Sequence, residues 1–102
     1  TNMIQGILDL VKTEMQIEFN EDSLHYERFV THLKFLAQRL YRHEMLKDEE
    51  VELAQMLENK YPKEYECSKK IASYIKQEYG WEISGEEVMF LSIHIRRVCM
   101  TE

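Results

Sequence analysis

The sequence contains few of the residues that interrupt a regular backbone. Its 102 residues include three glycines and one proline, which leaves few positions for tight turns and favours long helices. The two cysteines, Cys67 and Cys99, lack the spacing of a disulfide framework, so we expect free thiols. No apolar run approaches the ~20 residues that span a bilayer, so no membrane insertion is expected. No secretory leader is visible either, and we therefore expect a cytoplasmic protein.

Positive charge is also scarce. The formal net charge is −6, and both halves are acidic, with −4 over residues 1–51 and −2 over residues 52–102. A surface that binds nucleic acid needs a basic face to neutralise phosphates. The sequence therefore predicts that this chain binds no RNA or DNA directly.

The length and the hydrophobic pattern indicate one domain over residues 1–102. A helical pattern begins almost at Thr1, so we expect the sequence to be a piece of a longer chain. Apolar residues recur at helical spacing in five segments. The fold class expected is all-α, a compact antiparallel bundle of about five helices. The expected helices span residues 3–17, 23–43, 48–61, 62–79 and 84 to the end.

Several helix boundaries have candidate stop or start residues. Asn20 or Asp22 is expected to cap the second helix, and the acidic residues 48–50 suit the positive end of the third. Pro62 suits the first turn of the fourth helix, and Gly80 its end. Ser84 and Glu87 match the capping-box spacing at the start of the fifth helix, with Ser84 as N-cap and Glu87 at N3.

Two histidines lie inside apolar helical segments, and each is followed at helical spacing by an arginine. Arg39 comes two turns after His32, and Arg97 comes one turn after His94. A titratable imidazole near a core is costly unless its polar atoms are hydrogen-bonded or the ring has a functional role. One interpretation is a satisfied core histidine beside a surface arginine. The other is a nucleophilic imidazole that accepts a phosphoryl group, which needs a neutral ring nitrogen, partial exposure and a nearby cation.

Other kinds of site find less support. No pair of histidines or cysteines has the short spacing of a structural zinc site, and HExxH is absent, so we expect no metal and no cofactor. There is no hydrolase constellation and no glycine-rich phosphate loop, so no catalytic residues are expected and an enzyme is disfavoured. His25 and His43, near the ends of the second helix, are expected on the surface.

The two histidine segments resemble a known pair of motifs. YERFVTHLKFLAQR, over residues 26–39, and EEVMFLSIHI, over residues 86–95, are similar to the first and second histidine motifs of PTS-regulation domains, or PRDs. Arg39 matches the arginine that ends the first motif, and Glu87 matches the acidic residue that opens the second. Thr31 stands where many family members have Asp. The residues of the first motif are most similar to those of the same motif in the second PRD of BglG-type transcriptional antiterminators.

The resemblance implies a five-helix domain that forms a homodimer and is regulated by the bacterial sugar phosphotransferase system. His32 and His94 would be phosphorylated, with Arg39, Arg97 and Glu87 stabilising the phosphoryl group or an interface. The expected donor is the phosphocarrier HPr, with a sugar-specific enzyme II as a second candidate. RNA would be bound by an N-terminal domain outside this sequence.

Three alternatives stay open at the level of the sequence. The chain could be the same kind of domain in a DNA-binding transcriptional activator. It could be a phosphorelay domain that passes a phosphoryl group onward. It could also be a plain structural helical module, which would not be phosphorylated at all.

Overall fold

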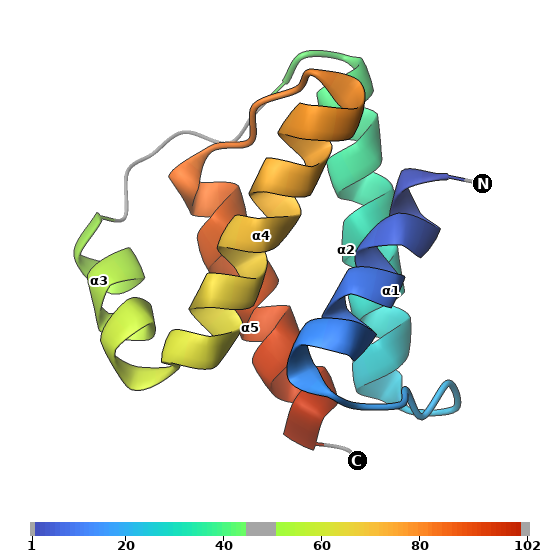
Figure 1. Ribbon diagram of the computed structural model, residues 1–102, viewed down its shortest axis with the longest axis vertical. Coiled ribbons are helices and arrows are strands. Elements are labelled where there is room, and N and C mark those ends of the chain that lie inside the picture. Colours follow the sequence, from blue (N-terminus) through green and yellow to red (C-terminus); the bar gives the residue numbers. More distant parts are fainter. Residues whose placement is uncertain (1, 45–50, 101–102) are drawn as a thin grey trace.

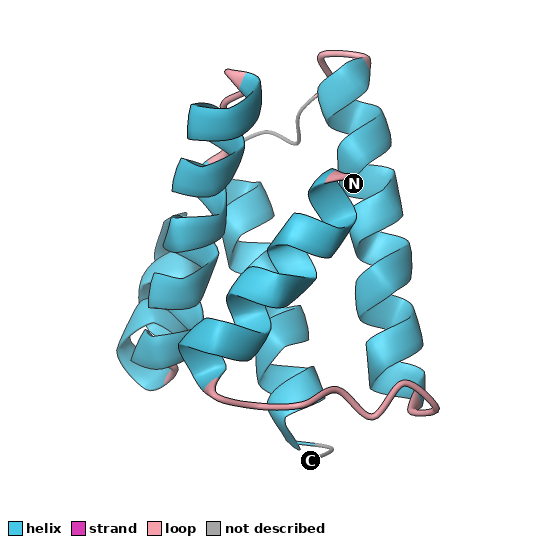
Figure 2. Cartoon of the chain, turned by 45° about the vertical axis from the view of Figure 1, so that its right-hand side comes forward, coloured by secondary structure: helices cyan, strands magenta, loops and turns pink. Residues whose placement is uncertain are grey.

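A short helix packs against the side of a larger helical bundle (Figure 1). The computed structural model describes residues 2–44 and 51–100, and within these ranges the chain forms five helices and no strand (Figure 2). This confirms the expected all-α class. The helices are α1 (Met3–Met15), α2 (Leu24–Tyr41), α3 (Val51–Lys60), α4 (Pro62–Tyr79) and α5 (Gly85–Met100).

The fold is centred on the packed pair of α4 and α5, and it is α5 that also contacts α2. Helix α5 packs against α2, α3 and α4, whereas α1 bridges α2 and α4. In Figure 1, α2 and α4 run upward and α1, α3 and α5 run downward, so most packed pairs are antiparallel. The antiparallel bundle predicted from the sequence is thus confirmed. This arrangement brings α2 and α5, which carry the two motif histidines, side by side.

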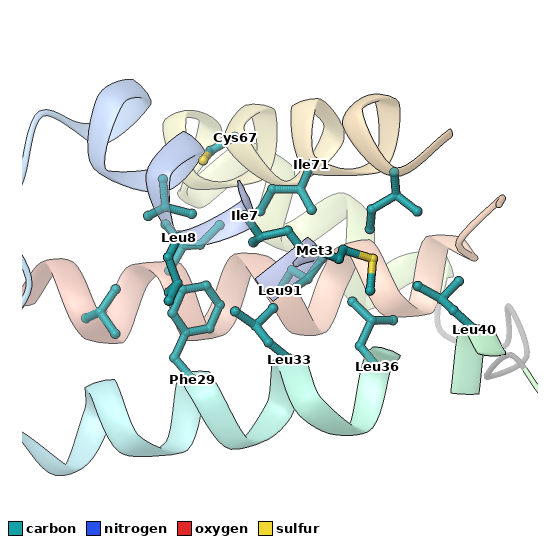
Figure 3. Packing of buried hydrophobic residues seen from close by; sticks show 14 residues of the cluster. Met3, Ile7, Leu8, Phe29, Leu33, Leu36, Leu40, Cys67, Ile71 and Leu91 are labelled. Carbon is teal, nitrogen blue, oxygen red and sulfur yellow. The ribbon is translucent and has the colours of Figure 1, made fainter. Parts of the chain in front are cut away.

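The core consists of the apolar stripes of α1, α2, α4 and α5. These stripes repeat at spacings of three and four residues, as expected for helices that bury one face. Figure 3 shows the α2 residues facing those of α1, α4 and α5 across the core. The fully buried members include Ile7 and Val11 of α1, Phe29, Leu33 and Leu36 of α2, Ile71 and Ile75 of α4, and Leu91 and Ile95 of α5.

The structure confirms one predicted helix start and corrects another. Pro62 opens α4 as predicted. The cap of α2 is Ser23, whose Oγ accepts a hydrogen bond from the Tyr26 N–H at 3.1 Å. The prediction of Asn20 or Asp22 was wrong. Asn20 instead accepts from the Asp22 N–H at 3.2 Å, so its side chain shapes the turn before the helix.

The ends of α1 and α2 each come two residues earlier than predicted. Gln16 (φ 55°) and His43 (φ 59°) adopt the left-handed conformation that ends a helix. The next residue then donates back across the turn, Ile17 to the Lys12 carbonyl at 3.2 Å and Glu44 to the Arg39 carbonyl at 2.8 Å. Glycine usually occupies such positions, and Gly80 (φ 72°) does so at the end of α4, as predicted.

The third helix packs less deeply than the others. Its expected face, formed by Ala54 and Leu57, is half-buried, and Tyr61 lies just before α4 instead of continuing α3. The acidic start predicted at residues 48–50 lies outside the described residues. The helix contacts only α4 and α5 to any extent, so it lies away from the face that carries the histidines.

Candidate functional site

His32 of α2 and His94 of α5 lie against each other. Their ring centroids are 4.6 Å apart, and the ring planes are inclined by 34°. The sequence placed both residues in similar settings, and the packing of α2 on α5 brings them into one site. Two separate candidate residues are therefore one histidine pair.

Aromatic rings cover the inner side of this pair. Phe29 is stacked on His94 with centroids 6.0 Å apart, and Phe90 lies 6.5 Å from His32. Both histidines are half-buried. Their open side faces a shallow depression of about 390 Å³ on the surface, which is also lined by Leu24, Arg28, Thr31 and Phe35. The depression therefore gives a donor molecule access to the pair.

Burial keeps both imidazoles uncharged. It lowers the pKa of His32 to about 4, with a smaller effect from the positive charge of Arg39. The pKa of His94 is also lowered to about 4, first by burial and then by the charges of His32, Arg97 and His25. At neutral pH each ring is neutral and retains a nitrogen lone pair. A neutral ring nitrogen is what a nucleophilic histidine requires.

Arg39 and Glu87 form a bidentate ion pair that ties α2 to the start of α5. Arg39 Nε donates to Glu87 Oε2 and Arg39 Nη2 donates to Glu87 Oε1, each at 2.7 Å. The Glu87 side chain is fully buried, so the guanidinium compensates a charge that has lost its hydration. Both predicted residues are thus brought together, although their part in holding a phosphoryl group stays a prediction.

The predicted capping box is only partly formed. Ser84 Oγ accepts a hydrogen bond from the Glu87 N–H at 3.2 Å, which confirms Ser84 as the cap. Both carboxylate oxygens of Glu87, however, accept from Arg39 across the α2–α5 contact. The residue that fits a local capping motif therefore serves a tertiary contact.

The remaining charged and titratable candidates surround the histidine pair. Arg97 is exposed one turn after His94 and contributes to lowering its pKa. His43 is exposed as predicted, but His25 is half-buried, with its Nδ1 shielded from solvent, so the surface prediction for it was wrong. Sequence reasoning also missed Arg28, which lines the depression. Its position one turn before His32 was the available indication.

The described part of the chain offers little support for metal binding or thiol chemistry. Among those residues, no group of three His, Cys, Asp or Glu side chains could hold a metal ion. Cys67 and Cys99 form no disulfide. Burial raises the pKa of Cys67 to about 12, so its thiol is unreactive. Within the same residues, no helix combines the length and hydropathy that crossing a membrane requires.

The fold and this site define an all-α domain with a partly accessible histidine pair between two packed helices. A family model described as the PRD domain matches residues 5–98. The chain therefore belongs to the PRD family, which confirms the resemblance of its two histidine motifs. Membership makes it a regulatory domain and not an enzyme, of a kind controlled by the phosphotransferase system.

Named relatives agree with this assignment. The chain is 48% identical to the transcription antiterminator LicT of Bacillus subtilis and 42% identical to a beta-glucoside operon antiterminator of Dickeya chrysanthemi. Each match covers 96% of this chain and 35% of the relative. Identity to the protein GlcT of Staphylococcus aureus is 31%, over 92% of this chain and 33% of that protein. The chain thus spans about a third of the length of these relatives.

Proposed function

We propose that this chain is the second PRD of a cytoplasmic transcriptional antiterminator, and that His32 and His94 accept phosphoryl groups within it. The observation that carries the proposal is the pair of neutral, partly accessible imidazoles with centroids 4.6 Å apart. Two relatives named as antiterminators, each matched over 96% of the chain, support this choice of function. In this proposal an RNA-binding domain elsewhere in the longer protein carries out antitermination.

The chemistry follows from the neutral rings. A lone pair of the imidazole attacks the phosphorus of phosphohistidine in HPr, a P–N bond forms on the acceptor, and the donor P–N bond breaks. The donor ring takes back the electron pair. Nearby guanidinium groups stabilise the phosphoryl oxygens as charge develops on them. A sugar-specific enzyme II is a second donor of the same type.

Phosphorylation would add negative charge to a surface that combines exposed apolar side chains with Glu27 and Arg28. Leu24 and Phe35, which line the depression, are 57% and 53% exposed. A phosphoryl group adds about −1.5 to −2 charges at neutral pH. We infer that a second copy of the chain packs on this face, because a symmetric contact brings the histidine pairs of both copies near the interface. Phosphorylation then shifts the dimer and, through it, the attached domain.

The association state tests the regulatory part of the proposal. We expect labelling by phosphorylated HPr to shift the balance between monomer and dimer, because new charge enters the contact face. Sedimentation velocity of one preparation before and after labelling measures the shift. The His32→Ala, His94→Ala double variant, treated in the same way, is the control and should not respond. A chain that stays strictly monomeric before and after labelling contradicts the proposal.

A second expected result concerns nucleic acid. The net charge of −6 should prevent the chain from binding RNA by itself, since phosphate binding requires a basic surface. Fluorescence anisotropy of a labelled RNA hairpin, titrated with the chain at low salt, should show no saturable binding. A sub-micromolar, salt-sensitive complex would overturn this prediction.

A further inference from the structure

The ring nitrogens of the two histidines differ in their access to solvent. Among the described residues, the buried side-chain atoms that lack a hydrogen-bond partner include Nε2 of His32 but neither nitrogen of His94. Nδ1 of His32 is not among those buried atoms, and no hydrogen bond links it to another described side chain. His32 therefore presents Nδ1 alone to the depression, whereas His94 is not restricted in this way.

We infer that His32 accepts its phosphoryl group on Nδ1, and that Arg28 is the cation that binds the phosphoryl oxygens there. The inference rests on the proposed function and specifies the acceptor atom and the pairing residue. In-line transfer requires the donor phosphorus to approach along the acceptor lone pair. A donor protein cannot reach a nitrogen enclosed between helices, so Nε2 is excluded in this conformation.

The lone pair of Nδ1 forms a P–N bond, the donor P–N bond breaks, and its electron pair returns to the donor imidazole. The proton of the neutral His32 ring resides on Nε2 and stays there, so the product is an imidazolium ring phosphorylated on Nδ1. Only the Nε2–H tautomer leaves the lone pair on the accessible nitrogen.

The choice of Arg28 follows from the charges around the depression. Arg39 already gives two hydrogen bonds to the buried carboxylate of Glu87, and withdrawing it would leave that charge unpaired. Arg28 lines the depression one turn before His32, together with Thr31, whose hydroxyl can also donate. Glu27 lies on the same rim and opposes an incoming phosphoryl group, so the guanidinium also offsets its repulsion.

The experiment determines the phosphohistidine isomer at each position. The wild-type chain is labelled with phosphorylated HPr and digested, and the peptides that carry His32 and His94 are separated. Antibodies specific for Nδ1- or Nε2-phosphohistidine then identify each isomer. We expect the Nδ1 isomer at His32. The Nε2 isomer at His32 overturns the inference alone and leaves the proposed function standing. Label confined to His94 overturns the inference together with the assignment of His32 as an acceptor. A chain without any phosphohistidine overturns both.

Matched variants test the role of Arg28. At saturating phosphorylated HPr, Arg28→Gln should slow the labelling of His32 about tenfold through loss of a charge-assisted hydrogen bond. Arg42→Gln removes the same charge from the other end of α2, where Arg42 is exposed, and should leave the rate within about twofold. Conversely, Arg28→Lys should restore part of the rate. Equal rates for Arg28→Gln and Arg42→Gln would refute the assignment of Arg28.

Discussion

Replacing Arg39 by Met is expected to lower the free energy of unfolding by about 3–5 kcal/mol, because it leaves a buried carboxylate unpaired. Glu87 has no exposed side-chain surface, and both its oxygens accept from Arg39 at 2.7 Å. The lost interaction also joins α2 to the first turn of α5. Urea unfolding followed by circular dichroism measures the change.

Two controls separate this effect from a general loss of surface charge. Lys76→Met breaks the Lys76–Glu82 ion pair, which is nearly as short, at 2.8 Å, but exposed. This change should cost less than about 1 kcal/mol. The Arg39→Met, Glu87→Met double variant removes both charges and should recover most of the stability lost in Arg39→Met. If Arg39→Met costs no more than Lys76→Met, the Arg39–Glu87 pair does not hold the two helices together.

Mild acid should destabilise the domain through the histidine pair. The pKa of both His32 and His94 is about 4 in the folded chain, against an ordinary value of 6.5. Between these values the unfolded chain binds protons that the folded chain does not. The stability contributed by the neutral rings is therefore fully present above pH 6.5 and is lost as the pH falls to about 4. A loss of about 3 kcal/mol is expected for the pair, since both rings are partly exposed and titrate together.

Unfolding curves measured at several pH values test this expectation. The His32→Gln, His94→Gln variant carries no ionisable group at either position, so its stability should vary less over the same range. The difference between the two chains isolates the histidines from the carboxylates, which titrate in both. Parallel curves for the two chains would show that the histidines do not titrate as their burial requires.

The helices themselves follow from hydrophobic periodicity, but their ends do not. Pro62 and Gly80 mark α4 because their backbone preferences act locally. Gln16 and His43 end α1 and α2 in a left-handed conformation that their side chains do not favour. Backbone hydrogen bonds from the next residues, Ile17 to Lys12 and Glu44 to Arg39, close these turns. Neither Gln16 nor His43 is a residue type from which such an end is predicted. The sequence consequently predicted both ends two residues too late.

In the site, too, the sequence pattern predicted the individual residues but not the contacts between helices. His32 and His94 could be singled out because an imidazole on an apolar face is unusual, and because their motifs resemble those of a family. Their contact could not be predicted, since it depends on the rotation of α2 against α5. The same rotation directs Glu87 to Arg39. It also leaves Arg28 on the rim of the depression.

The assignment of His32 and His94 as phosphoryl acceptors is tested most directly by labelling four chains with phosphorylated HPr. These are the wild type, His32→Ala, His94→Ala and the double variant, analysed by mass spectrometry under conditions that preserve phosphohistidine. Each single variant should lose part of the label, because the neutral rings form one site but accept separately. The double variant should take up almost none. A double variant labelled as well as the wild type would place the acceptor elsewhere in the chain.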